Sequence, residues 1–173
     1  DTIGAVVEDP TNTMVPSITH TDVLCFDGSD GTIDLTITGG LAPYDFDWSN
    51  GSSDEDLTGL STGNYFVLIM DANMCESFIS AFVDQPDAPL LSTAQTVDIL
   101  CFGDTTGSID VTTTGGTTPY GFSWNTGAIS EDLSDIGAGS YSLTVTDDNA
   151  CQYVLDTVLF EPTDMLLTTT QVN

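Results

Sequence analysis

The sequence contains no lysine and no arginine, whereas it has 27 aspartate and glutamate residues and a single histidine, so the net charge is −27 at pH 7. The absence of basic residues excludes a basic surface for nucleic acid or anionic lipid. It also excludes a phosphate-binding P-loop, which requires a lysine. Salt bridges to Lys or Arg cannot form, so the carboxylates repel one another unless cations screen or bind them. This composition suits an exterior medium rich in salt or divalent ions.

Other absences narrow the class of protein further. The sequence has no run of 18 apolar residues that would predict a membrane-spanning helix. It has no CxxC pair and no Cys/His cluster of the kind that binds zinc. It also has no initiator methionine and no signal peptide, and we therefore expect it to be an excerpt from a longer secreted product.

A tandem repeat of 76 residues organises the chain. The segment GGLAPYDFDW at residues 39–48 recurs as GGTTPYGFSW at residues 115–124, and 24 of the 72 positions from Met14 to Gln85 match their partners without a gap. The repeat predicts one domain at residues 14–85 and a second at residues 90–161. Residues 1–9 align with the last strand of a repeat, and residues 166–173 align with a first strand. We interpret these two ends as orphan strands of a preceding and a following repeat.

Short strands separated by turns are predicted throughout each repeat. Residues 32–38 alternate apolar and polar side chains, as a half-buried strand does, and residues 44–48 place three aromatic side chains on one face. Leu57 and Leu60 are expected to fill the core before strands at residues 65–70 and 76–83 complete the repeat. No segment has an amphipathic helical period, so the pattern predicts an all-β fold of two β-sandwiches. The linker at residues 86–89 is short and contains two prolines, which favours a semi-rigid, rod-like array.

The ordered motifs resemble those of a known family. The pattern is C-F-x-x-x-x-G-x-I-D, then G-G-x-x-P-Y-x-F-x-W, then L-x-x-[LI]-x-x-G-x-Y, then D-x-N-x-C and a strand that ends at proline. This set resembles the SprB-type repeat of large cell-surface adhesins in gliding Bacteroidota. The resemblance implies an Ig-like domain, export, and a role in an adhesin or surface filament. The first repeat departs from the pattern at Gln85, where a glutamate is expected before the proline.

Four cysteines occur at identical spacing in the two repeats, at Cys25, Cys75, Cys101 and Cys151. This spacing is typical of disulfides formed in an oxidising compartment. We predict the intra-repeat bonds Cys25–Cys75 and Cys101–Cys151, each of which would staple loops near strand ends. Closing a loop of about 50 residues contributes about 4 kcal/mol in the chain-entropy model. The alternative is that the cysteines are free thiols.

Turns rich in acidic and amide side chains are candidate calcium ligands. The candidates are Asp27, Asp30, Asp71, Asn73, Asp104, Asp147 and Asn149. Calcium takes six to eight oxygen ligands, so two turns would have to converge at one end of a sandwich. The alternative is that Asp and Asn serve only the turns themselves.

Two further surface features are predicted. Phe66, Leu68 and Met70 make a strand apolar on both faces, whereas the second repeat has polar residues there, so we predict that these three residues form an interaction patch with another chain, repeat or bound layer. The tripeptides Asp-Thr-Ile at residues 1–3, Asp-Thr-Thr at residues 104–106 and Asp-Thr-Val at residues 156–158 resemble an O-glycosylation motif, Asp-Ser/Thr-aliphatic, and mark Thr2, Thr105 and Thr157 as candidate acceptors.

No catalytic constellation recurs in both repeats. His20 is replaced by Thr96, and the neighbouring carboxylates Asp45 and Asp47 are replaced by Gly121 and Ser123. Asp45 and Asp47 are predicted to be solvated, and Trp48 and Trp124 to belong to the core rather than to a sugar-stacking platform.

We therefore expect a non-enzymatic structural module of a secreted bacterial surface adhesin or extracellular filament. Its expected partners are neighbouring copies or repeats of the same protein, with surface glycans as a further possibility. No cofactor is expected unless calcium binds. The alternative is a glycan- or calcium-binding module of a cell-surface protein.

Overall fold

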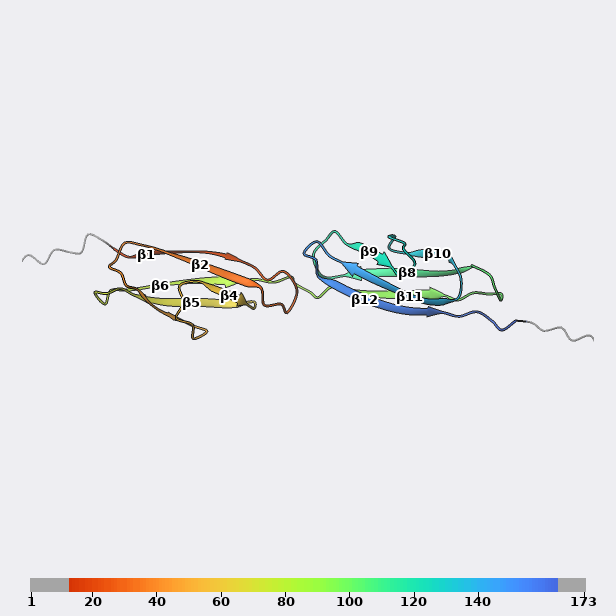
Figure 1. Cartoon of the computed structure of the whole chain (residues 1–173), viewed down its shortest axis with the longest axis horizontal. Coiled ribbons are helices and arrows are strands. Elements are labelled where there is room, and N and C mark those ends of the chain that lie inside the picture. The colour runs from red at the N-terminus through yellow and green to blue at the C-terminus, as the bar shows by residue number, and fades with distance from the viewer. Residues whose placement is uncertain (1–12, 165–173) are drawn as a thin grey trace, which may run out of the picture. The chain divides into compact units, whose positions relative to one another are not determined.

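Residues 13–164 are described by the computed structural model, and the chain divides into two compact units, Asp1–Gln85 and Pro86–Asn173. Every regular element of the described residues is a β-strand (Figure 1). The strands of the first unit are β1 (Val15–Thr21), β2 (Gly31–Thr38), β3 (Asp45–Trp48), β4 (Leu57–Leu60), β5 (Gly63–Met70) and β6 (Glu76–Val83). Those of the second unit are β7 (Leu91–Val97), β8 (Gly107–Thr114), β9 (Gly121–Trp124), β10 (Leu133–Ile136), β11 (Gly139–Thr146) and β12 (Gln152–Leu159). The predicted all-β fold is confirmed.

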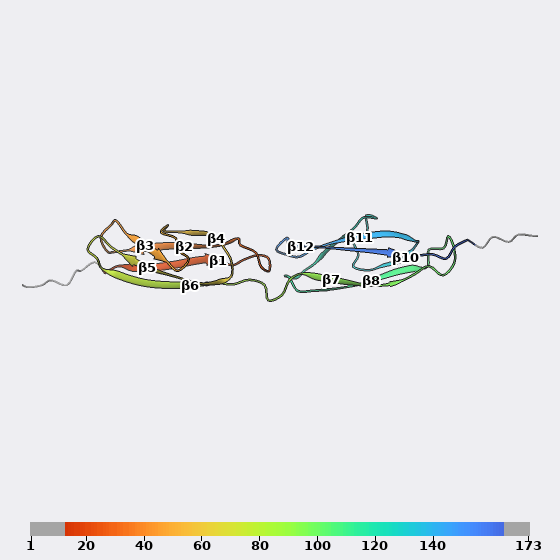
Figure 2. The same ribbon diagram turned by 90° about the horizontal axis from the view of Figure 1, so that it is seen from below.

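Each unit consists of two three-stranded antiparallel sheets. In the first unit the strand orders are β1-β2-β4 and β3-β5-β6, and in the second they are β7-β8-β10 and β9-β11-β12. Figure 1 shows β1 and β2 on one side of the first unit and β5 on the other, and Figure 2 shows the same strands turned by 90°. These orders correspond to strands A-B-E and C-F-G of an immunoglobulin sandwich, without strand D. The fold is therefore an Ig-like sandwich, repeated once along the chain.

The core of each unit lies between its two sheets. In the first unit it includes Trp48, Val67 and Ile69, and Leu57 and Leu60 are buried as predicted. Buried and more exposed side chains alternate along the strands, because successive side chains of a strand point to opposite faces of the sheet. In the second unit Trp124 is also buried, so the prediction that both tryptophans belong to the core is confirmed.

Two hydrogen bonds mark the Ig-like character of both units. The hydroxyl of Tyr65 donates to the carbonyl of Ser61 at 3.0 Å, and that of Tyr141 donates to the carbonyl of Gly137 at 2.8 Å. Each tyrosine lies near the start of the F-type strand and bonds back over the preceding corner, which is the tyrosine corner of Ig-like domains. The indole N–H of Trp48 donates to the carbonyl of Asp54 at 2.8 Å, so this buried polar group is satisfied.

The glycine pair of each repeat forms a tight loop before the aromatic strand. Gly115 and Gly116 have φ values of 70° and 59°, which side-chain-bearing residues rarely adopt. The hydroxyl of Tyr120 closes the loop by donating to the carbonyl of Gly115 at 2.6 Å. A Cβ atom on Gly115 would overlap the carbonyl oxygen of Pro89. This position therefore requires glycine for both conformation and space.

A buried aspartate fastens this loop to the turn between the last two strands. In the first unit, Asp71 Oδ1 accepts the backbone N–H groups of Cys75 at 2.9 Å and Asn73 at 2.8 Å, and Asp71 Oδ2 accepts that of Leu41 at 3.1 Å. Asp147 makes the same three bonds in the second unit. The amide of Cys75, followed by those of Leu41 and Asn73, lowers the pKa of Asp71 below 3.8 despite its burial, because these donors stabilise the ionised carboxylate.

Two other aspartates of each unit also accept backbone N–H groups across loops. Asp22 accepts the amide of Asp84 at 2.9 Å, beside the backbone bond from Val23 to Asp84. Asp56 accepts the amide of Leu35 at 3.0 Å. Asp98 and Asp132 make the matching bonds in the second unit. We refer to the Asp71, Asp22 and Asp56 positions of both repeats as the carboxylate clasps.

We predict that Gly115→Ala is more destabilising than Gly127→Ala. Both glycines have positive φ, at 70° and 88°, so either alanine introduces a left-handed residue that costs about 1–2 kcal/mol. Nothing lies within 4 Å of a Cβ on Gly127, whereas a Cβ on Gly115 meets the Pro89 carbonyl. We expect Gly115→Ala to cost roughly 1–3 kcal/mol more in the free energy of unfolding, measured by denaturant titration. Equal losses would contradict the close approach of the two loops.

We predict that the stability difference between the native chain and Asp71→Asn depends on pH. The amide of asparagine places an N–H group opposite one of the backbone donors, so the variant melts at a lower temperature near neutral pH. Because the folded pKa of Asp71 lies below 3.8, its contribution is full above the unfolded pKa and is lost as pH falls through the folded pKa. Melting temperatures measured from pH 7 to pH 2 should therefore converge at the acid end. A difference that stays constant over this range would contradict the role of the ionised carboxylate.

Candidate functional site

The outer face of β5 and β6 carries large exposed apolar side chains. Phe66 and Leu68 of β5 are 46% and 39% exposed, and Phe78 and Phe82 of β6 are 62% and 50% exposed. The antiparallel register places Leu68 opposite Phe78, and the rings of Phe66 and Phe78 lie 5.8 Å apart between centroids. We call these four residues the phenylalanine face. The structure thus places Phe66 and Leu68 of the predicted patch at the surface, whereas Met70 is only partly exposed.

Carboxylates border the phenylalanine face. Asp47 of β3 pairs with Leu68, and Asp45 and Glu76 both pair with Met70. All three acidic residues are exposed, which confirms the prediction that Asp45 and Asp47 are solvated. A shallow, open depression between β3 and this face is lined by Asp47, Trp48, Ser49, Phe66, Leu68 and Phe78. The surface is therefore an apolar strip with an acidic rim.

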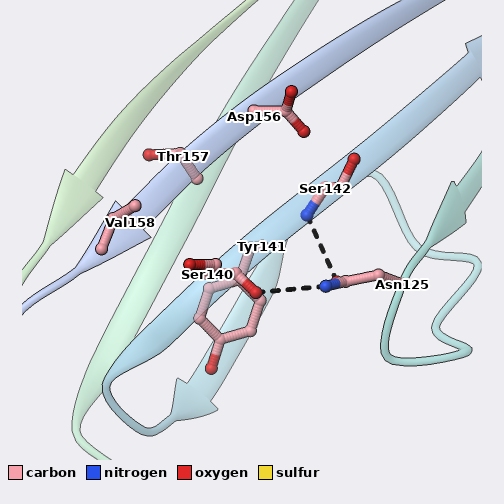
Figure 3. Close-up of a pocket in the computed structure, with 7 residues that line it drawn as sticks. All are labelled: Asn125, Ser140, Tyr141, Ser142, Asp156, Thr157 and Val158. Carbon is pink, nitrogen blue, oxygen red and sulfur yellow. Dashed lines mark hydrogen bonds between the residues drawn. The ribbon is translucent and has the colours of Figure 1, made fainter.

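The corresponding face of the second unit is less apolar, because its β11 strand is polar there, although Phe78 and Phe82 are replaced by the exposed Val154 and Val158 of β12. The 76-residue offset replaces Phe66 by Ser142 and Leu68 by Thr144, and it replaces Ser80 of β6 by Asp156 of β12. Figure 3 shows this face, where the side chain of Asn125 reaches β11. Its amide donates to the carbonyl of Ser140 at 3.1 Å, and its Oδ1 accepts the N–H of Ser142 at 3.2 Å. The two units therefore share one core but present different outer faces.

The predicted pairing of the cysteines is wrong. Cys25 and Cys151 are disulfide-bonded, whereas Cys75 and Cys101 are free and exposed. Disulfide bonding is thus present, but neither intra-repeat bond, Cys25–Cys75 or Cys101–Cys151, is formed.

The strand directions explain why these pairs cannot form. The loop of Cys25 lies where β6 ends, because the amide of Asp27 donates to the side chain of Gln85 at 3.0 Å. Cys75 directly precedes the start of β6, and a strand of eight residues spans roughly 26 Å. A disulfide requires Cα atoms within about 7 Å. The second unit repeats this arrangement, with Gly103 donating to Glu161 at 2.8 Å.

Within each unit, the structure does not bring the candidate calcium ligands together. Asp27 and Asp30 lie at the end of the first unit where β6 finishes, whereas Asp71 and Asn73 lie where it begins. Asp104 and the pair Asp147 and Asn149 are separated in the same way in the second unit. Asp71 and Asp147 already accept three backbone N–H groups each. Within residues 13–164 no group of three or more His, Cys, Asp or Glu side chains could hold a metal ion.

The remaining candidates are His20 and the threonines of the glycosylation-like tripeptides. His20 Nε2 lies 3.5 Å from Asp22 Oδ1 at the exposed end of β1, where Asp22 already serves a carboxylate clasp. Thr105 is exposed in the loop before β8, Thr157 is partly buried in β12, and Thr2 lies outside the described residues. Their glycosylation stays a prediction.

Sequence reasoning missed two features of the surface and the loops. Phe78 and Phe82 extend the predicted patch, and their spacing of four along an alternating strand placed them on one face. The clasping role of Asp71 and Asp147 was also missed, although both lie in the D-x-N-x-C motif. The one sequence signal for this role was the alternative interpretation that Asp and Asn serve the turns themselves.

Comparisons with known proteins agree with the repeat. The family model of the SprB repeat matches the chain twice, at residues 17–53 and 93–129. No curated protein matches the chain, and residues 13–164 contain no helix that could cross a membrane.

Several solved structures are similar over most of their length. The DIP-gamma IG1+IG2 structure has 13% identity and a TM-score of 0.41, covering 83% of this chain and 96% of its own. The amphioxus IgVJ-C2 molecule has 11% identity and a TM-score of 0.36, covering 80% and 98%. The fibronectin(III)-like modules of Clostridium thermocellum CbhA have 14% identity and a TM-score of 0.36, covering 84% and 94%. At these TM-scores, the fold assignment depends on the strand order and the tyrosine corner.

The two family matches fall on equivalent stretches, each from the first strand to the turn after the tryptophan strand. They coincide with the internal repeat and with the two sandwiches. The chain therefore carries two stretches that match the SprB repeat, one in each sandwich.

Proposed function

We propose that the chain is a non-enzymatic structural module of a secreted surface adhesin or extracellular filament. One observation carries this proposal: the residues that are identical in the two repeats build the sandwich, whereas the outer face differs. The identical positions include the carboxylate clasps at Asp22, Asp56 and Asp71, the core residue Trp48 and the tyrosine corner at Tyr65. A scaffold that repeats its interior and varies its exterior serves display or spacing rather than a fixed chemical reaction.

The chemistry of the surface supports a location outside the cell. Disulfide-bonded cysteines are typical of oxidising compartments, and Cys25 and Cys151 are bonded in this way. The exterior carries carboxylates without lysine or arginine, so the folded chain depends on cations of the medium for screening.

The phenylalanine face is the part of the module that we propose to bind a partner. Its apolar strip is bordered by Asp45, Asp47 and Glu76. A second copy of this chain offers no lysine or arginine to pair with these carboxylates. Charge complementarity therefore favours a different chain, whose apolar surface is bordered by basic residues.

The substitution set Phe66→Ser, Leu68→Thr and Met70→Thr tests this surface, because it copies the second repeat. The probe is a layer that carries both alkyl chains and amines, compared with layers that carry only one of these groups. We expect the native chain to bind the mixed layer best, and the variant to bind at least about tenfold more weakly, since loss of these contacts removes about 1.4 kcal/mol or more. Surface plasmon resonance measures both affinities.

A matched control makes the opposite change in the second unit. Ser142→Phe, Thr144→Leu and Thr146→Met should create a second strip and raise binding to the mixed layer. Equal binding by the native chain and the first variant would show that the phenylalanine face does not carry the interaction.

The proposed location is tested with antibodies raised against the folded chain. Intact cells that produce the protein should be labelled without permeabilisation, and brief shearing should release labelled material into the medium. Labelling that appears only after lysis would overturn the proposal of a surface module.

A further inference from the structure

The bonded and free cysteines are related by the repeat. Each free cysteine is the counterpart, 76 residues away, of a bonded one: Cys101 corresponds to Cys25, and Cys75 corresponds to Cys151. One cysteine of each type is thus disulfide-bonded, and one cysteine of each type keeps a free thiol. Both types of cysteine loop can therefore hold a disulfide-bonded cysteine. Cys75 and Cys101 are the two positions that hold a free thiol instead.

The surroundings of the free thiols differ from those of the bonded cysteines. Beside Cys101, Leu100 is 78% exposed and Phe102 is 55% exposed, whereas Leu24 beside the bonded Cys25 is 49% exposed and Phe26 is only partly exposed. Cys75 follows Met74, which is 81% exposed. Apolar side chains thus stand in solvent next to both free thiols. A protein partner bonded to either thiol would cover these apolar side chains.

The two free thiols occupy different ends of their own units. Cys75 lies at the end of the first unit where β6 begins, beside the clasp of Asp71. Cys101 lies at the end of the second unit where β12 finishes, in the loop that Glu161 holds through Gly103. A contact between these two unlike surfaces is heterologous, so it can repeat from copy to copy without closing.

We propose that Cys101 of one copy of this chain forms a disulfide with Cys75 of a second copy. This deepens the proposed function, on which it rests, by making the partner of these two loops another copy of the module. The linkage joins unlike ends, and repetition extends it into a linear, covalently linked series. The phenylalanine face takes no part in it.

The bond forms by thiol–disulfide exchange with a small-molecule disulfide such as oxidised glutathione. The Cys101 thiolate attacks the glutathione disulfide and releases one glutathione thiolate. The Cys75 thiolate of the second copy then attacks the Cys101 sulfur of this mixed disulfide and releases the second glutathione. The two cysteines lose two protons and two electrons in total, and one glutathione disulfide is reduced to two thiols.

Like charge opposes the approach of two copies, each with a formal charge of −27. Screening must therefore precede bonding. In about 1 M salt the Debye length falls to about 3 Å, compared with about 30 Å at 0.01 M. We therefore expect the disulfide between copies to form faster at high salt than at low salt.

The test uses two complementary variants of the whole chain, Cys75→Ser and Cys101→Ser, with one of them isotopically labelled. Each is incubated with oxidised glutathione at high salt, alone and as an equal mixture, and is analysed by intact mass and non-reducing electrophoresis. We expect the mixture to give a heterodimer of twice the 18.2 kDa chain mass, and each variant alone to stay monomeric. The native chain should give a ladder of multiples that collapses with reductant, and the variant lacking both thiols should give none.

Peptide mapping identifies the bond. Digestion at aspartate should yield a peptide that links Cys101 to Cys75, while Cys25 and Cys151 stay bonded as before. Homodimers from the single variants in amounts equal to the heterodimer would overturn the proposal, as would only glutathione adducts or an exchange that bonds Cys75 within its own chain. None of these outcomes affects surface labelling of cells or binding through the phenylalanine face, so the inference can fail while the proposed function stands.

Discussion

Hydrogen bonds from backbone amides to aspartate carboxylates hold the loops of each sandwich in place. A protein without lysine and arginine cannot form ion pairs with these residue types at the clasp positions, and most of its 27 acidic residues have no basic partner. Hydrogen bonds to an ionised acceptor are roughly twice as strong as those between neutral groups. Asp71 joins the glycine loop to the last turn, Asp22 joins the ends of the first and last strands, and Asp56 accepts the amide of Leu35 in β2. In residues 13–164 no buried side-chain polar atom lacks a hydrogen-bond partner.

This use of carboxylates gives several aspartates of the chain a structural role. Aspartate has a short side chain that reaches amides two to four residues away, as Asp71 does with Asn73 and Cys75. Where a longer reach is needed, Gln85 and Glu161 serve equally well, since each accepts one amide of the cysteine loop through a side-chain oxygen. The departure of Gln85 from the expected glutamate therefore keeps the bond and removes a charge.

Much of the fold could be predicted from the sequence because its signals are local. Alternation along residues 32–38 and 141–146 indicates which side chains enter the core, and the 76-residue repeat transfers each signal to the other unit. The cysteine pairing could not be predicted in this way. Equal spacing in two repeats says which residues are equivalent, but only the direction of β6 shows that Cys25 and Cys75 lie at opposite ends of one unit. The extent of the phenylalanine face likewise depends on the register between β5 and β6.

The arrangement of the first and last strands has a mechanical consequence. In each unit the chain enters along β1 or β7 and leaves along β6 or β12, and these two strands lie beside one another and run in the same direction. Tension applied through the chain therefore pulls them past each other along their length. The bonds that join their ends, Val23 to Asp84 and Asp84 to Asp22 in the first unit, are then loaded together in shear rather than one after another as in a zipper. Because forced unfolding is governed by the unfolding rate, this geometry resists pulling to a degree that equilibrium stability alone does not describe.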